Sequence, residues 1–422
     1  MSATDEQNIQ GGLGAVKGLQ VSGVSVGLRK KPGKRDLALI VAPAGSKAAG
    51  VFTQSNFAAA PVYLSKEHLA AQNAGKDFKA LIINSSNANA ATGAEGMRIA
   101  KKTVGIVATA LSCDDEQVLM ASTGVIGVQL PFEHFGTGVP LAIEALSAGD
   151  GKGVKEGTDA AEAIMTTDTV PKTAARSFTL KQQDGSEQTY TVGGMAKGSG
   201  MIAPHMATMI AALGTDAQLE QAALDAALKE AVSVSFNKVT IDSDTSTNDS
   251  AYLIATGALP GEVIEKGSAA YMSFVAALTE VCQDLAYQIA RDGEGATKVI
   301  VVDVEGAVSE KDADLVARAI ADSPLVKTAV TGHDANWGRI AMAAGKAGAT
   351  FSQEDVSISV MDLEVFKQGV PVAFSEDEAL KRFEERDEVH IVVDLSAGEA
   401  STRIWTCDLT KEYIAINGDY RT

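Results

Sequence analysis

The sequence predicts a mixed α/β protein. Short, mostly apolar runs bounded by polar residues, glycine or proline are typical of buried strands, and they alternate with longer segments of helical periodicity. The chain has 422 residues and 45% hydrophobic residues, enough for about two to four domains with apolar cores. High apolar content with well-mixed charge also excludes a mainly disordered chain.

The predicted strands are short apolar runs spread along the whole chain. Each is of the length and composition expected for a strand that is covered on both faces. These runs are Leu37–Val41, Ala80–Ile83, Gln117–Ala121, Lys298–Val304, His390–Asp394 and Thr402–Thr406. Ser396-Ala-Gly398 lies between the last two runs and predicts that they form a pair joined by a turn.

Three segments predict amphipathic helices. Thr215–Val232 and Ser375–Arg386 both begin with a capping-box pattern. Ala269–Arg291 carries apolar residues at helical spacing and is followed by Gly293, a common helix stop. The charges of the 375–386 segment form i,i+4 pairs, which indicate a solvated helix face.

Charge is unevenly distributed. The formal net charge is −18, which argues against a nucleic-acid or anionic-membrane partner. The first 207 residues hold 19 basic and 18 acidic residues, whereas the rest hold 17 and 36. The acid excess therefore lies entirely in the second half.

The N-terminus and the cysteines bear on localisation. Met1-Ser-Ala-Thr-Asp-Glu6 lacks the basic and apolar regions of a secretory signal, and stretches such as Leu37–Ala44 are too short to span a bilayer. Cys113, Cys282 and Cys407 have no CxxC spacing, and we interpret them as reduced thiols used as small apolar residues. These observations predict a cytoplasmic protein.

The most unusual segment is glycine-rich and runs from Gly193 to Ile210. Its glycines permit a tight turn, and Pro204 interrupts regular structure. The apolar run Met209–Leu213 predicts a buried strand that begins at Thr208. Thr208 is therefore expected at a loop-to-strand junction, held by a rigid element.

Two other interpretations of this segment compete. Gly198-x-Gly200-x-x-Ala203 matches a loose dinucleotide fingerprint, but Pro204 would fall inside the following helix and no convincing long strand precedes the glycines. The P-loop pattern is absent. The other interpretation is a glycine-rich surface turn in which Lys197 is merely solvated.

Residues 197–209 resemble the signature of the ornithine acetyltransferases, the glutamate N-acetyltransferases of the cyclic arginine pathway. His205 stands where this family more often has Asn, so we interpret it as a loop residue. Further blocks resemble the family in family order to the end of the chain, and chance does not explain all of them together. They are Ser85–Gly93, Ala121–Gly127, Thr166–Thr169, Asp242–Asp249, Ala290–Lys298, Asn336–Arg339 and Ala415–Thr422.

The resemblance implies self-cleavage between Ala207 and Thr208, giving chains 1–207 and 208–422, with Thr208 as the nucleophile. The residue types suit this chemistry. A hydroxyl is a weak nucleophile and needs a base, and an N-terminal α-amine with a pKa near 8 supplies one on the same residue. Threonine's β-branching also restricts the direction of its hydroxyl.

The resemblance also assigns an oxyanion hole and substrate contacts. Thr123 and Gly124 would hold the oxyanion, although spacing alone also fits a simple strand-ending turn. Lys197 would pair with the substrate α-carboxylate, and Glu294 would pair with the side-chain ammonium of ornithine. The implied substrate-binding residues are Thr166, Lys197, Thr208, Glu294, Asn417 and Thr422.

The aspartates at 242, 244 and 249 are not arranged as a calcium loop, because Thr247 and Leu253 stand where Gly and Glu are required. We expect these acids to stabilise the fold near the site. The remaining histidines show neither a Ser/His/Asp context nor a metal-binding spacing; they are His68, His134, His333 and His390.

The architecture implied by the resemblance is a layered α-β-β-α sandwich, shared with the N-terminal-nucleophile aminopeptidases. A main domain, 1–295, would contain the cleavage site and precede a smaller C-terminal domain, 296–422. The glycine-flanked loop Asp292–Gly295 marks this boundary. The resemblance further implies an assembly of two α and two β chains.

The implied reaction is ping-pong transfer of an acetyl group from N2-acetylornithine to L-glutamate through an ester on Thr208. It requires no cofactor or metal, and acetyl-CoA is a possible second acetyl donor. The alternatives are an aminopeptidase or amidase on the same fold, an acetyltransferase of secondary metabolism, and the nucleotide-binding module considered above.

Overall fold

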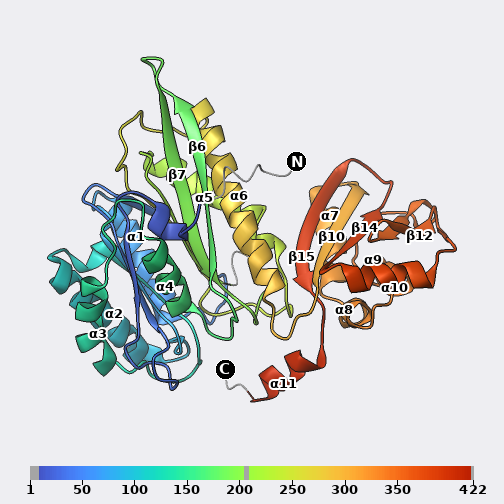
Figure 1. Cartoon of the computed structure of the whole chain (residues 1–422), viewed down its shortest axis with the longest axis horizontal. Helices are drawn as coiled ribbons and strands as arrows, with labels where there is room; N and C mark the ends of the chain where they lie inside the picture. The colour runs from blue at the N-terminus through green and yellow to red at the C-terminus, as the bar shows by residue number, and fades with distance from the viewer. Residues whose placement is uncertain (1–8, 204–208, 420–422) are drawn as a thin grey trace.

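The computed structural model describes residues 9–203 and 209–419. Two stacked sheets with helices on both outer faces form the larger part of the molecule (Figure 1). This arrangement is the predicted α-β-β-α sandwich, and the predicted fold class is confirmed. A third sheet with its own helices forms the C-terminal part, drawn in orange and red.

The first sheet has the strand order β1-β2-β4-β5. Its strands are β1 (Gln20–Val24), β2 (Leu37–Val41), β4 (Ala80–Asn84) and β5 (Val118–Ser122). Strand β2 is apolar on both faces because both are covered. Leu37 and Leu39 pack toward the helices, whereas Ala38 and Ile40 pack between the two sheets.

Helices α1 (Ala60–Asn73), α2 (Gly93–Leu111) and α3 (Glu133–Glu144) cover this sheet. Helix α4 (Val154–Ile164) packs closely on β1. That approach requires a glycine at position 23, because a Cβ there would lie 1.9 Å from the carbonyl oxygen of Asp159.

The second sheet has the order β3-β9-β8-β7-β6, in which only the β8–β9 pair is parallel. Side chains of β8 alternate between the space inside the sandwich and the outer face. Helices α5 (Gln221–Ser233) and α6 (Ala269–Arg291) cover that outer face. The strands are β3 (Lys47–Phe52), β6 (Lys172–Lys181), β7 (Glu187–Lys197), β8 (Ile210–Thr215) and β9 (Ser250–Ala255).

The C-terminal sheet has the order β13-β12-β11-β14-β10-β15 and a separate apolar core. Its strands are β10 (Val299–Ala307), β11 (Ser357–Val360), β12 (Leu363–Lys367), β13 (Val370–Pro371), β14 (Glu388–Asp394) and β15 (Ala400–Cys407). Its helices are α7 (Glu310–Ala321), α8 (Pro324–Thr331), α9 (Trp337–Gly345) and α10 (Glu376–Glu385). The division of the chain into two domains at residue 295 stays a prediction.

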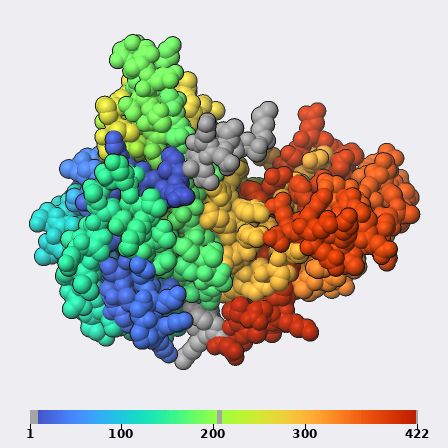
Figure 2. Space-filling model, viewed as in Figure 1, coloured from blue at the N-terminus to red at the C-terminus, as the bar shows by residue number. Residues whose placement is uncertain are grey.

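After β15 the chain turns back as α11 (Lys411–Asp419), which lies below the sandwich and the C-terminal sheet in Figure 1. The space-filling view shows the same helix, in red, beneath the yellow and orange surface of the central region (Figure 2). A C-terminal segment is thereby brought to residues that come much earlier in the chain.

Several predicted elements agree with the structure and three do not. Strand β2 and helix α6 have the predicted bounds, and Ser375 caps α10 by accepting a hydrogen bond from the Glu378 N–H. The helix predicted to begin at Thr215 begins instead at Gln221, because Thr215 still pairs with Val192 and Ala255 in the sheet.

The predicted pairing of the last two long strands is also wrong. Strand β10 lies between them, parallel to β14 and antiparallel to β15. Residues 396–398 therefore cross over β10 instead of forming a tight hairpin turn. The third error concerns the glycine-rich segment. The sequence predicts no long strand before its glycines, but the 11-residue strand β7 directly precedes Gly198.

No helix in the described ranges is both long and apolar enough to cross a bilayer. Cys113, Cys282 and Cys407 are all free thiols, and the latter two are buried.

Candidate active site

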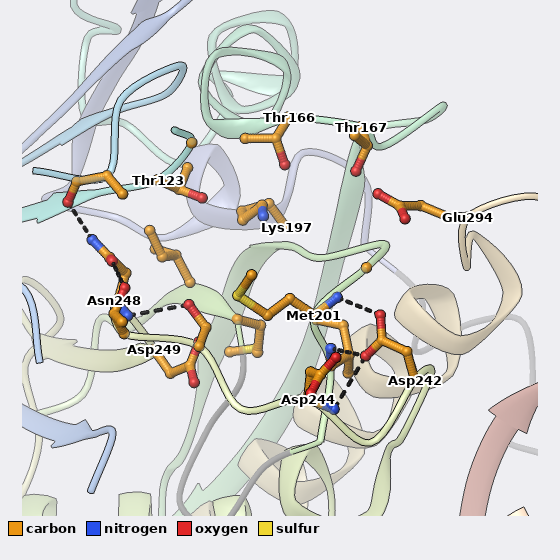
Figure 3. A pocket seen from close by; sticks show the side chains of 18 of the residues that line it. Thr123, Thr166, Thr167, Lys197, Met201, Asp242, Asp244, Asn248, Asp249 and Glu294 are labelled. Atoms are coloured by element: carbon orange, nitrogen blue, oxygen red, sulfur yellow. Dashed lines mark hydrogen bonds between the residues drawn. The ribbon is translucent and has the colours of Figure 1, made fainter. Parts of the chain in front are cut away.

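A cavity of about 210 Å³ opens where strands β5 and β7 and helix α6 end. Figure 3 shows side chains from these elements converging on it. The cavity brings together six predicted site residues that are far apart in the sequence: Thr123, Gly124, Thr166, Lys197, Glu294 and Asn417. Ala207, Thr208, His205 and Thr422 lie outside the described residues, and Met209 lines the cavity.

Thr123 and Gly124 follow directly after β5. The Thr123 N–H donates to the carbonyl oxygen of Asn84 (3.0 Å), so Thr123 offers its hydroxyl, rather than its amide, to a bound group. Gly124 has φ +133°, and a Cβ there would lie 2.2 Å from the carbonyl carbon of Ser86. Only glycine therefore fits this turn beside the cavity.

Lys197 is the last residue of β7 and is 8% exposed. Burial lowers the pKa of its ammonium, because water no longer solvates the charge, while the nearby Asp168, Asp249 and Glu294 favour the charged form. A cation held among carboxylates in a small cavity can pair with an additional carboxylate brought by a ligand.

The cluster formed by Asp168, Lys172 and Asp292 lies behind one wall of the cavity, and we call it the interior ion cluster. The Lys172 Nζ lies 2.7 Å from Asp168 Oδ1 and 2.5 Å from Asp292 Oδ2. Burial alone would raise the pKa of Asp168, but the positive charges of Lys172 and Lys197 hold it well below its ordinary value. Both buried carboxylates are therefore matched by cations.

The interior ion cluster also fixes the backbone around the cavity. Asp168 accepts hydrogen bonds from the N–H groups of Thr166 and Gly198, both at 2.8 Å. The Asp292 carbonyl oxygen accepts from the Ser199 hydroxyl (2.6 Å). The segments that carry Thr166, Lys197 and Glu294 are thus tied to one buried set of charges.

The opposite wall is formed by residues 242–249. Asp242 accepts hydrogen bonds from the N–H groups of Met201 (2.7 Å) and Ile202 (2.8 Å), so it holds the turn after β7. Asn248 donates to the carbonyl oxygens of Ala88 (2.5 Å) and Ser122 (2.8 Å), which links this wall to the strand end that precedes Thr123.

Helix α11 completes the site through polar contacts. It buries none of its described side chains. The Asn417 amide donates to Glu294 Oε2 (2.6 Å), and the Tyr413 hydroxyl donates to Asp242 Oδ2 (3.1 Å). The Thr410 hydroxyl, which precedes the helix, donates to the Gly295 carbonyl oxygen (2.7 Å). The helix therefore lies against both walls.

Other site types are not favoured by this geometry. In the described ranges, no group of three or more His, Cys, Asp or Glu side chains is placed to hold a metal ion. The dinucleotide fingerprint requires a helix directly after its glycines, whereas residues 201–203 are irregular and the next described element is strand β8.

Comparison with known proteins gives a consistent result over nearly the whole chain. The model of the ArgJ family matches residues 20–422. The chain belongs to the ArgJ family. It is 45% identical over 415 residues to the arginine biosynthesis bifunctional protein ArgJ of Symbiobacterium thermophilum, with 98% of this chain and 99% of the relative covered.

The protein of the same name from Bacillus subtilis is 42% identical, with 98% of this chain and 97% of the relative covered. A crystal structure of the ArgJ protein from Bacillus halodurans covers 49% of this chain and 96% of its own, with 43% identity and a TM-score of 0.48. The predicted family is confirmed, as is the prediction of an acyltransferase in arginine biosynthesis. The hydrolase alternative is not favoured.

Sequence reasoning missed several residues that shape this ArgJ-family site. Lys172, Asp292 and Tyr413 were not predicted to have a role, and Asn248 was noticed only as part of a motif. One signal was present, because Asp168 lies inside the 166–169 block. The strand residue Lys172 faces two buried aspartates only because β6 packs on the end of α6, and the sequence does not show this packing.

Proposed function

We propose that this ArgJ-family protein transfers the acetyl group of N2-acetylornithine to L-glutamate. The acetyl group would pass through an ester on Thr208, after self-cleavage between Ala207 and Thr208. The observation that carries this proposal is the convergence of Thr123, Lys197 and Glu294 on one small cavity that Met209 also lines. The family match and the names of the relatives support an arginine-biosynthetic acyl transfer.

The charges of the cavity suit both substrates. Each has an α-carboxylate, which we assign to Lys197, and the donor's side-chain ammonium would pair with Glu294. Glu294 is 7% exposed and is oriented by the Asn417 amide. A buried carboxylate and a buried ammonium, placed apart, select a ligand that carries the opposite charges at the same spacing.

The oxyanion that forms at the acetyl carbonyl needs fixed donors. The Thr123 hydroxyl and the Gly124 amide would serve, since both lie on a rigid turn that directly follows β5. Thr166 would contact the substrate from the other side. The acetyl ester must be shielded from water, and a cavity lined by buried loops and closed by α11 would provide this shielding.

Other parts of the proposal concern the surroundings of the reaction. We infer an assembly of two α chains (1–207) and two β chains (208–422) in the cytoplasm. We also infer that the transfer needs no metal or cofactor, and that acetyl-CoA serves as a second donor. An assay of glutamate with acetyl-CoA, run beside acetylornithine, tests the last point directly.

The decisive variant is Thr208→Ala. It is expected to stay as one uncleaved, inactive chain on denaturing electrophoresis, whereas the parent gives two fragments of similar size. Thr179→Ala, on the exposed β6–β7 hairpin, is the matched control and should cleave and react normally. Normal transfer by an uncleaved Thr208→Ala chain would refute the proposal, and release of acetate without glutamate dependence would indicate a hydrolase.

A further inference from the structure

Asp249 has an unusual hydrogen-bonding state. Among the buried side-chain nitrogen and oxygen atoms of the described residues, only two lack a partner: Gln72 Oε1 and Asp249 Oδ2. Gln72 lies in α1 and does not line the cavity, whereas Asp249 is 2% exposed and lines it. A buried polar atom without a partner destabilises the fold, so native proteins seldom keep one without a use.

Asp168 and Asp249 make an instructive pair, because both are buried near Lys197. Asp168 has its oxygens occupied by Lys172, Gly198 and Thr166. Asp249 has no such set of partners. Burial raises the pKa of its carboxyl well above the ordinary value, and the opposing effects of Lys197 and Ser246 are smaller. The surroundings of Asp249 therefore favour its protonated form, whereas those of Asp168 favour the ionised form.

The surroundings of Asp249 reinforce this difference. Lys197 is the cation that faces it, and Lys197 is already near the ionised Asp168. Among the described residues, the other titratable groups that line the cavity are acids or a phenol, and none of them favours ionisation of Asp249. They are Asp242 and Asp244 from its own loop, Glu294 from the loop after α6 and Tyr413 from α11.

Asp249 is held rigidly beside the proposed reaction centre. The adjacent residue Asn248 is bonded to the Ser122 carbonyl oxygen, directly before Thr123. On the other side, the Ser250 N–H donates to the Met209 carbonyl oxygen (2.9 Å). The neighbours of Asp249 in the sequence thus connect it to the strand end that carries Thr123 and to Met209, the residue that follows Thr208.

We propose that Asp249 is an acid–base residue of the acetyl transfer, exchanging its proton with the α-nitrogen of donor and acceptor. This inference rests on the proposed function. As the donor C–N bond breaks, the nitrogen takes the proton of the Asp249 carboxyl and leaves as a neutral amine. The acetyl group stays on the nucleophile as an ester, and the hydroxyl proton passes to the N-terminal amine.

The second half-reaction runs in the opposite direction. The neutral amine of the acceptor forms the new C–N bond and gives a proton to the Asp249 carboxylate. The nucleophile's C–O bond breaks, and its oxygen takes its proton back from the N-terminal ammonium. Asp249 and the nucleophile are then in their starting protonation states, so no other reactant is consumed.

The test varies the leaving group. Asp249→Asn keeps the shape of the side chain but cannot give up a proton in this way. Single-turnover acetylation from acetylornithine should fall by about 10²–10⁴-fold, the usual effect of losing a general acid. Acetylation from p-nitrophenyl acetate, whose phenolate leaves without taking a proton, should stay within about threefold of the parent enzyme.

Asp216→Asn is the matched control. Asp216 is also 2% exposed, and burial raises its pKa to about 6, but it does not line the cavity. It should leave the rates with both donors unchanged. An equal loss with both donors in Asp249→Asn would show a structural role and overturn the inference, as would an unchanged rate with acetylornithine. A parent enzyme that never uses acetylornithine would instead refute the proposed function.

A measurement on the parent enzyme covers the case in which Asp249→Asn does not mature. When acetylornithine is bound, its carboxylate pairs with Lys197, so an acid that must be protonated makes the single-turnover rate at saturating acetylornithine fall as the pH rises past its raised pKa. This alkaline fall should be absent with p-nitrophenyl acetate. An acetylornithine profile without the fall, or the same fall with both donors, would overturn the inference.

Discussion

The interior ion cluster differs from a second, more exposed cluster on the C-terminal sheet, formed by Asp303, His390 and Arg403. In the interior cluster the Asp168 and Lys172 side chains are fully buried. In the sheet-face cluster Asp303 lies 2.7 Å from both partners, yet the Arg403 side chain is 51% exposed. The distances within the two clusters are similar, but the clusters differ in their exposure to solvent.

This difference decides what each cluster does. Buried charges lose their hydration, so they persist only where every partner is in place, and they hold the attached backbone in one arrangement. Exposed pairs gain little because water and salt screen them. The interior cluster therefore fixes segments around the cavity, whereas the sheet-face cluster only adds contacts among β10, β14 and β15.

The largest effect is expected for Lys172→Met. This change leaves Asp168 and Asp292 buried near each other without their shared cation. The free energy of unfolding should fall by about 3–5 kcal/mol, measured by urea denaturation. The kcat/KM for acetylornithine should also fall, because the segments carrying Thr166 and Glu294 lose their common anchor.

Lys155→Met is the control for this prediction. The Lys155 side chain also pairs with an aspartate four residues away, but it is 75% exposed. Its removal should change stability by no more than about 0.5 kcal/mol. A loss below about 1 kcal/mol for Lys172→Met would show that the interior cluster is not the anchor described here.

Tyr413→Phe tests the polar docking of α11 against Asp242. One hydrogen bond is worth about 1 kcal/mol, or about fivefold in an equilibrium constant. The KM for acetylornithine should rise about fivefold with little change in kcat, since the helix closes the site without entering the chemistry. Tyr63→Phe, half-exposed on α1, is the control; a lowered kcat at unchanged KM would contradict this account.

Arg403→Met addresses the sheet-face cluster. The free energy of unfolding should fall by only about 0.2–1 kcal/mol, and the difference from the parent should shrink further in high salt because the pair is screened. Urea denaturation at low and high salt measures both. A loss comparable to that of Lys172→Met would remove the distinction between the two clusters.

The smallest effect is expected for His390→Gln. Asp303 raises the pKa of His390, so the protonated imidazole stabilises the fold below its ordinary pKa and loses this contribution as the pH rises through the raised value. Asp303 stays ionised throughout this range, because its pKa is lowered to about 2. The Tm difference between parent and variant should be larger at about pH 5.5 than at about pH 9. Equal Tm differences at the two pH values would contradict this role of His390.

Local sequence patterns predicted those elements whose own residues favour them. Strand β2 has the bounds of its apolar run, and α10 begins at its capping serine. Thr215 shows the limit of such patterns: it matched a helix cap, but its backbone is used by two neighbouring strands. The predicted pairing of β14 with β15 is wrong for the same reason, because β10 lies between them and supplies hydrogen-bond partners from a distant part of the chain.

The sequence by itself determined the alternation of strands and helices, the family and the residue types of the candidate site, because these depend on composition, spacing and motif. Only the tertiary structure decided which of those residues share a cavity and what charge each carries. A pKa depends on burial and on neighbours brought from elsewhere in the chain. Asp168 and Asp249 are the same residue type, and only their surroundings lower the pKa of the first and raise the pKa of the second.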